Sequence, residues 1–208
     1  SLRLSSFNFS LHIEAELDGE VSSTNIDLGV NAYMESFENN GFLSQPWTLE
    51  GNAHWSINSD QYYEGNYSAQ SGNIGDNTIS SLSITMDIVE SGSISFYKRV
   101  SCEEVGSYSG NYYDYLAFYI DGVEESKWAG EQDWSQSSFD VDIGEHVFTW
   151  KYIKDQGVSS GQDAAWVDDI IFPPAYVESN NVLGDLNMDQ VVNVLDVILL
   201  VNMILGTE

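Results

Sequence analysis

Oxygen-bearing side chains near the end of the chain have the spacing of a calcium-binding loop. Between residues 185 and 196, loop positions 1, 3, 5, 9 and 12 are all Asp or Asn. A hard divalent cation takes about six to eight oxygen ligands at roughly 2.3–2.6 Å, and a short loop can supply them from these positions and from the carbonyl of position 7. We therefore predict at least one bound Ca²⁺, with the ligands Asp185, Asn187, Asp189, Val191, Asn193 and Asp196.

One position of this loop departs from the usual pattern. Gln190 occupies position 6, where glycine normally allows the positive φ of the turn, so we expect strain there to weaken the site. The segment 184–206 resembles half of a type I dockerin repeat, in which position 12 is Asp. The resemblance implies calcium binding and, as one alternative for function, docking to a cohesin on a scaffold. A dockerin has two packed repeats and only one stands here, which counts against that alternative.

The residues after the loop predict one helix over 194–205, followed by a stop at Gly206. Within it only Asp196 and Asn202 are polar, and a helix that is apolar all round is normally buried. It is shorter than the roughly 20 residues that a membrane span needs. We therefore expect this helix to dock either on its own chain or on another subunit.

The charge of the chain restricts its partners and its location. Six Lys and Arg residues stand against 33 Asp and Glu, which gives a formal net charge of −27. Nucleic acids and anionic membrane surfaces are poor partners, because both are negatively charged. The single cysteine, Cys102, cannot form an internal disulfide. Since calcium can replace disulfides as a staple outside the cell, we expect a secreted protein, extracellular or at the cell surface, without a membrane span.

Residues 1–34 predict a β-strand or hairpin arm. Apolar and polar residues alternate from Phe7 to Leu17, Asp18-Gly19 marks a tight turn, and residues 21–28 can return as a second strand. This arm is either the last hairpin of an upstream domain or an element that pairs with another copy of the chain. In the second case head-to-tail assembly into a fibre or filament would use its apolar positions, namely Phe7, Phe9, Leu11 and Ile13.

Residues 35–175 predict a jelly-roll β-sandwich, so the chain is expected to be mainly β. Turn residues such as Asp121-Gly122 separate a series of short strand-like runs. These runs are residues 82–88, 93–97, 115–120, 139–143, 146–152 and 166–172. No helical period appears before residue 194. Residues 176–183 are the expected linker to the dockerin-like half repeat, 184–208, with its calcium loop and helix.

Several short motifs of the body domain stand in a recognisable order. They are SFE at 36–38, YEGNYSA at 63–69, GSISF at 92–96, YDYL at 113–116, FYIDG at 118–122 and DAAWVDDI at 163–170. This order resembles MAM-like and cleaved-adhesin-like domains of bacterial surface adhesins and secreted peptidases. The resemblance implies a concanavalin-like sandwich used for adhesion or binding. It also implies that Glu38 can share a structural cation with Asp168 or Asp169, the alternative being that these are solvated carboxylates at a sheet edge.

Aromatic residues in two loop regions are candidate ligand contacts. Exposed rings beside Asp and Asn can stack on sugar rings while the polar groups bind hydroxyls. The candidates are Tyr108, Tyr112, Tyr113, Trp128 and Trp134. The alternative is that these rings lie in the core or on a sheet face.

No motif of the chain predicts catalysis. The three histidines, His12, His54 and His146, have no metal-ligand spacing, and no nucleophile elbow or phosphate loop is present. We therefore expect a non-catalytic, calcium-stabilised interaction or assembly module of a surface adhesin or fibre, whose partner is a protein: another copy of itself or a surface scaffold. The alternative is a carbohydrate-binding module of a secreted hydrolase or peptidase, with a polysaccharide as its ligand. Glycosylation at Asn8 or Asn66 is left open.

Overall fold

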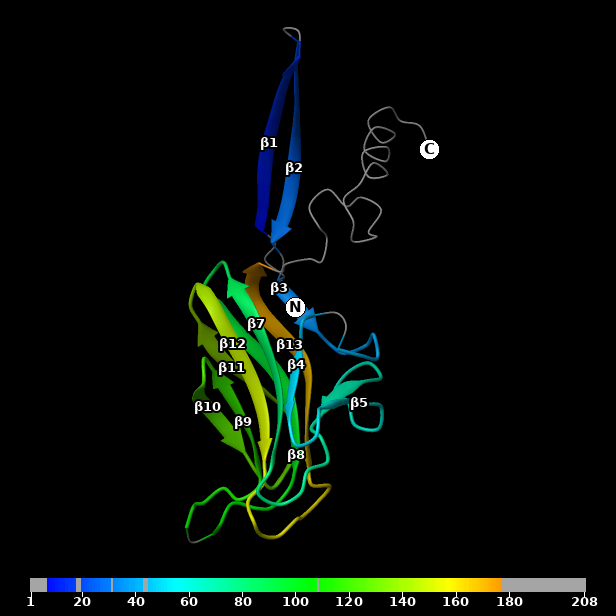
Figure 1. Cartoon of the computed structure of the whole chain (residues 1–208), viewed down its shortest axis with the longest axis vertical. Helices are drawn as coiled ribbons and strands as arrows, with labels where there is room; N and C mark the ends of the chain where they lie inside the picture. Colours follow the sequence, from blue (N-terminus) through cyan, green and yellow to red (C-terminus); the bar gives the residue numbers. More distant parts are fainter. Residues whose placement is uncertain (1–6, 18–19, 31, 43–44, 108, 177–208) are drawn as a thin grey trace. The chain divides into compact units, whose positions relative to one another are not determined.

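The computed structural model describes residues 7–17, 20–30, 32–42, 45–107 and 109–176, with side chains from residue 33 onward. The chain divides into two compact units, 1–176 and 177–208, and the second lies outside the described residues. Within the described residues there are thirteen strands and no helix (Figure 1). The prediction of a mainly β sandwich is confirmed. The predicted calcium loop and the helix after it fall in the unit that is not described.

The first layer of the sandwich is built around β7, and we call it the β7 layer. Its order is β4-β7-β12-β9-β10, and every neighbouring pair is antiparallel. The bounds are Thr48–Gly51 for β4, Ile79–Ile88 for β7, Gly144–Ile153 for β12, Tyr115–Ile120 for β9 and Val123–Trp128 for β10.

The second layer, which we call the β8 layer, is built on the long last strand, β13. It pairs with β8, β6 and β3, while β11 pairs with β8 and β5 with β6. The bounds are Ala164–Tyr176 for β13, Gly92–Ser101 for β8, Glu131–Val141 for β11, Ser68–Gln70 for β6, Ser56–Asn58 for β5 and Ala32–Glu35 for β3. The end of β13 also pairs with β7, at Ala175 and Ile88, so the two layers are continuous.

Alternation along the strands decides which side chains enter the core. In β8 the residues Ile94, Phe96 and Val100 are buried, while their neighbours Tyr97 and Arg99 are only half-buried. Aromatic rings from both layers meet between the sheets. Phe96 lies 4.9 Å from Phe118 and 5.3 Å from Trp150, measured between ring centroids. The sandwich thus has one aromatic core, and every second residue of a strand is left on an outer face.

The N-terminal segment forms a separate two-stranded antiparallel sheet. Its strands are β1, Phe7–Leu17, and β2, Glu20–Val30. Phe7 is opposite Val30 and Leu17 is opposite Glu20 across an unbroken register. The sequence pattern therefore identified both strands, while the predicted turn at Asp18-Gly19 lies outside the described residues. The described residues include no helix that could cross a membrane.

Candidate functional site

Two neighbouring tyrosines of the loop between β5 and β6 are the most exposed aromatic residues of the sandwich. Tyr62 is 42% exposed and Tyr63 is 41% exposed, whereas every other Phe, Trp and Tyr whose side chain the structure describes is buried or half-buried. An exposed ring costs free energy in water, so two adjacent ones suggest a surface that meets a ligand. The sequence analysis did not select either residue as a ligand contact.

The Tyr63 ring packs against the outer face of the β8 layer. It stacks on Tyr97 of β8 with ring centroids 3.5 Å apart and planes 11° from parallel. Trp134 of β11 lies beside the pair, 6.2 Å from the Tyr63 centroid. The pKa of Tyr63 is raised to about 12, mainly by a hydrogen bond with Tyr97. The three rings form a packed group, which we call the Tyr63 cluster.

The backbone of the same loop is held by a buried carboxylate, Asp168 of β13. Its Oδ2 accepts hydrogen bonds from the backbone N–H of Tyr63 at 2.9 Å and of Glu64 at 3.4 Å, and its Oδ1 accepts one from the N–H of Asp169 at 2.8 Å. Asp168 is fully buried, and this burial raises its pKa to about 7. Asp168 therefore fixes the backbone that carries the Tyr63 ring.

Glu38 holds the other end of the loop. Its Oε1 accepts hydrogen bonds from the backbone N–H of Asn66 at 2.8 Å and of Tyr67 at 2.9 Å, and its Oε2 accepts one from the Asn66 side chain at 3.2 Å. Burial acts to raise the pKa of Glu38, but these hydrogen bonds together lower it. Gly65 lies against this carboxylate with φ of +73°, and a Cβ there would come within 2.4 Å of the Glu38 Cδ. The loop therefore needs glycine at this position.

The structure places the predicted cation ligands, Glu38, Asp168 and Asp169, along this loop. Asp169 is almost fully buried and has a positive φ of 46°. Its pKa is raised by burial first and then by the negative charges of Glu64 and Glu38. Glu38, Glu64 and Asp169 therefore gather negative charge around the loop. Since the oxygens of Glu38 and Asp168 already accept loop N–H groups, their observed role is to hold the backbone, and a cation shared by them stays a prediction.

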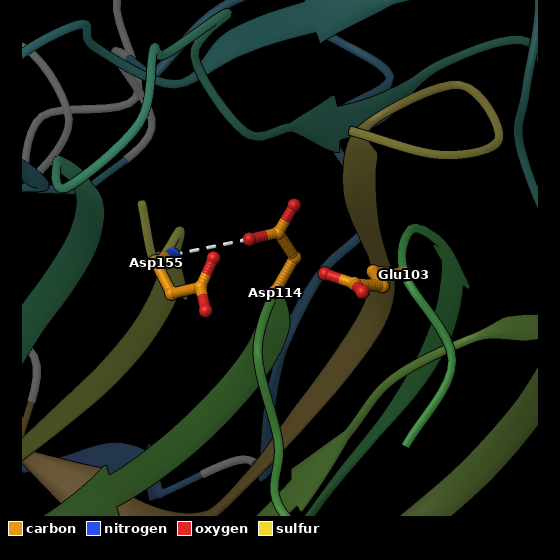
Figure 2. A group of neighbouring side chains, drawn as sticks. All are labelled: Glu103, Asp114 and Asp155. Atoms are coloured by element: carbon orange, nitrogen blue, oxygen red, sulfur yellow. Dashed lines mark hydrogen bonds between the residues drawn. The ribbon is translucent and has the colours of Figure 1, made fainter. Parts of the chain in front are cut away.

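A second group of carboxylates lies where three loops meet, after β8, before β9 and after β12. Figure 2 shows Asp114 between Glu103 and Asp155, and the three residues offer ligand oxygens within 4.8 Å of one another. The buried Asp114 accepts a hydrogen bond from the backbone N–H of Asp155 at 3.1 Å. Burial raises the pKa of Asp114 and of Glu103. Carboxylates at this spacing could hold a divalent cation by ligand type.

A lysine already places positive charge beside this group. The Lys154 ammonium lies 3.6 Å from the Asp114 Oδ2 and is also paired with Asp163. It donates a further hydrogen bond to the Ser159 hydroxyl at 2.7 Å. Lys154 and Asp114 are both nearly fully buried, so the ammonium balances a carboxylate that would otherwise be costly in the interior. The observed role of the group is to tie the loops together.

The structure separates the aromatic residues that the sequence grouped as ligand contacts. Trp134 belongs to the Tyr63 cluster. Trp128 packs edge-on against the buried Phe96, with its ring 4.7 Å from the Lys98 ammonium, at the margin of the core. Tyr113 has its hydroxyl 3.4 Å from the Ser109 Oγ. Tyr112 packs against Tyr115.

Other predicted residues lie beyond what the structure describes. Tyr108 is outside the described residues, and so are all six predicted ligands of the C-terminal loop, Asp185, Asn187, Asp189, Val191, Asn193 and Asp196. Phe7, Phe9, Leu11 and Ile13 lie in β1, whose backbone pairing alone is described. Calcium binding by the loop and assembly through β1 therefore stay predictions.

Comparison with known proteins identifies a shared fold but does not assign the chain to a family. No family model and no curated protein matches the chain. Among solved structures, the K1 cleaved adhesin domain of Lys-gingipain from Porphyromonas gingivalis W83 is similar, with a TM-score of 0.50 and 14% identity over 71% of this chain and 99% of that domain. The CBM22-1 xylan-binding domain of Paenibacillus barcinonensis Xyn10C matches with a TM-score of 0.44 and 17% identity over 67% of this chain and 90% of that one. The match to K1 shows that the two chains share a β-sandwich fold, as the order of the motifs had predicted.

Proposed function

We propose that the sandwich, residues 35–175, is a non-catalytic extracellular module that binds a glycan through the Tyr63 cluster. The observation that carries the proposal is the exposure of Tyr62 and Tyr63 on a loop that two carboxylates hold in place. A sugar ring buries its apolar face on an aromatic ring, and the exposed Glu64 and Asn66 of the same loop offer polar groups to its hydroxyls. A ring that is fixed before the ligand arrives loses little entropy on binding.

The buried titratable groups support binding rather than catalysis. The raised pKa of Asp168 and that of Asp114 arise from burial, and both residues accept backbone hydrogen bonds that hold loops. The fold is shared with a domain described as an adhesin, which is consistent with a binding role. Of the two ligand classes that the sequence leaves open, polysaccharide is the one that exposed tyrosines favour.

A glycan array tests this function. We expect the native protein to bind a restricted set of glycans and the Tyr62→Ala/Tyr63→Ala variant to lose that binding by about tenfold or more, the scale of a lost stacking contact. Tyr113→Ala, a tyrosine of another loop, is the matched control and should bind as the native protein does. Absence of glycan binding by the native protein, or equal binding by the double variant, would contradict the proposal.

A second candidate function is assembly through the β1–β2 hairpin. The register sets Phe7 opposite Val30, Phe9 opposite Leu28 and Leu11 opposite Ile26, so these apolar positions share one face of the hairpin. A two-stranded sheet is marginally stable in water unless another surface covers its apolar face. We infer that a second copy of the chain supplies this surface. Light scattering of the native protein and of a variant lacking residues 1–18 tests it, because equal masses would argue against assembly.

A further inference from the structure

Two lysines flank one small residue on the outer face of the β7 layer. Lys127 of β10 and Lys151 of β12 are both register partners of Ala117 in the strand between them, β9. The two lysines are half-buried on the outer face, whereas the alternate residues Leu116, Phe118 and Trp150 fill the core; Ala117 itself is also fully buried. Neighbouring strands are about 4.8 Å apart, so the two lysine backbones are separated by only about 10 Å.

Tyrosine rings lie under both ammonium groups. The Lys127 Nζ is 5.0 Å from the Tyr112 ring centroid and 5.5 Å from that of Tyr115, and the Lys151 Nζ is 5.0 Å from that of Tyr119. Tyr115 and Tyr119 stand two positions on either side of Ala117 in β9. We call this surface, formed by Tyr112, Tyr115, Tyr119, Lys127 and Lys151, the Lys–Tyr face.

The charge of this face is unusual for so acidic a chain. Of the other basic side chains that the structure describes, Lys98 and Lys154 are buried. Arg99 is paired with Asp133. Of the two cations of the Lys–Tyr face, Lys127 is paired with Glu124, whose carboxylate lies 3.0 Å from the Lys127 ammonium and accepts a hydrogen bond from the Tyr119 hydroxyl.

Within the described residues, Lys151 has no acid partner at ion-pair distance. Its register partners on either side are Ser81 of β7 and Ala117 of β9, and neither is charged. Its ammonium lies over the aromatic ring of Tyr119. A half-buried lysine whose ammonium has no carboxylate partner, in a protein of net charge −27, leaves a local site for a single anionic group.

We propose that the Lys–Tyr face binds the carboxylate of a uronic acid in an acidic polysaccharide. The carboxylate would pair with the Lys151 ammonium, which has no acid partner, and the Lys127 ammonium would add positive charge to the same face. A densely charged polymer such as nucleic acid is disfavoured by the net charge, whereas a uronic acid carries one charge per sugar ring. The proposal rests on the proposed function for the ligand class, a glycan, and places a second contact surface on the other layer.

Calorimetric titration with matched polymers tests the proposal. Soluble polygalacturonate, alginate and glucuronoxylan are each compared with their carboxyl-reduced counterparts, which keep the sugars and lose the charge. We expect at least one acidic polymer to bind about tenfold more tightly than its reduced form, and Lys127→Gln/Lys151→Gln to abolish this difference. Arg99→Gln, which removes a cation from the outer face of the β8 layer, should retain it.

Each outcome separates this proposal from the proposed function. Equal affinity for acidic and reduced polymers, no binding to any acidic polymer, or equal losses in the lysine and arginine variants would overturn the role of the Lys–Tyr face. Tyr63→Ala is titrated in parallel with the neutral glycans. If Tyr63→Ala binds the neutral glycans as tightly as the native protein does, the Tyr63 cluster is not their binding site. If acidic polymers still bind more tightly than their reduced forms, and this difference needs the two lysines, the role of the Lys–Tyr face is supported. Melting temperatures verify that each variant is folded.

Discussion

The two outer faces of the sandwich display aromatic rings by different physical means. On the β8 layer the Tyr63 ring comes from a loop, and two carboxylates from distant parts of the sequence, the buried Asp168 and the exposed Glu38, hold that loop in place. On the β7 layer the rings of Tyr115 and Tyr119 come from one strand, so strand register alone sets their spacing. A face built on a loop should be sensitive to single substitutions beneath it. A face built on a strand should respond mainly to changes in its own side chains.

The largest expected difference between the faces follows from removing the Asp168 carboxylate. Asp168→Ala leaves the backbone N–H groups of Tyr63 and Glu64 without their acceptor. We expect a loss of about 1–3 kcal/mol in the free energy of unfolding, the usual cost of unsatisfied buried donors, together with loss of binding at the Tyr63 cluster. Urea unfolding and calorimetry measure the two effects.

The control for Asp168→Ala is Asp133→Ala, at a carboxylate whose side chain is 86% exposed. It should change the free energy of unfolding by less than about 0.5 kcal/mol. Binding of acidic polymers at the Lys–Tyr face should survive in both variants. A loss of that binding in Asp168→Ala, at a temperature where the variant is folded, would show that the faces are not independent.

A methyl group at Gly65 should have a smaller effect of the same kind. Gly65→Ala places a side chain in the left-handed region and against the Glu38 carboxylate. We expect a loss of about 1–2 kcal/mol in stability and a weaker affinity at the Tyr63 cluster, with the Lys–Tyr face unchanged. Gly122→Ala is a fitting comparison, because it has φ of +79° but no atom within 4 Å of the added Cβ. Equal effects of the two substitutions would mean that the contact with Glu38 is unimportant.

Titration of Asp168 gives the loop-based face a pH dependence. Burial raises the pKa of Asp168 to about 7 in the folded chain, from the ordinary value of 3.8 for an aspartate. The folded state therefore holds this proton where the unfolded state has lost it, and the contribution of Asp168 to stability falls as the pH rises from about 4 to about 7. Urea unfolding in EDTA across this range should show a slope that Asp168→Asn lacks. Parallel curves for the two proteins would refute the shifted pKa.

We expect calcium to bind the C-terminal loop and neither of the two faces. We expect calcium added to the chelator-stripped protein to release or absorb heat, and Asp185→Asn/Asp189→Asn to abolish that signal, because both residues are predicted ligands of the C-terminal loop. Glycan affinity at the two faces should change by less than about twofold. A calcium signal that persists in the double variant and disappears in Glu38→Gln would move the principal cation site to the Tyr63 loop.

The sequence identified the strands that alternate cleanly and missed those that do not. In β12 the residues Phe148, Trp150 and Tyr152 are buried every second position, and this period was visible in the sequence. β10, Val123–Trp128, was missed because a half-exposed edge strand with three charged residues has no apolar period. The first half of β11 was missed for a similar reason, since a bulge between Gln132 and Ser135 breaks its alternation.

The candidate site could be predicted only in part, because its parts are distant in the sequence. Asp168 was selected, but as a cation ligand, and its hydrogen bond to Tyr63 joins residues 105 positions apart. Nothing local to Tyr62 and Tyr63 reveals that their rings are exposed. Trp128 lies in a polar stretch that favoured a surface role, yet strand pairing with Leu116 places it beside the core. Contacts between residues distant in the sequence decide the role of Asp168, the exposure of Tyr62 and Tyr63, and the position of Trp128. The local sequence around each residue does not reveal these contacts.

The most direct test of the account is the affinity of Tyr63→Ala for the strongest glycan found on the array. Isothermal titration of the native protein, Tyr63→Ala and Tyr113→Ala measures it under one set of conditions. The account predicts that Tyr63→Ala binds about tenfold more weakly while Tyr113→Ala binds like the native protein. Equal affinities of Tyr63→Ala and the native protein, with both folded, would contradict the claim that the Tyr63 cluster is the binding site.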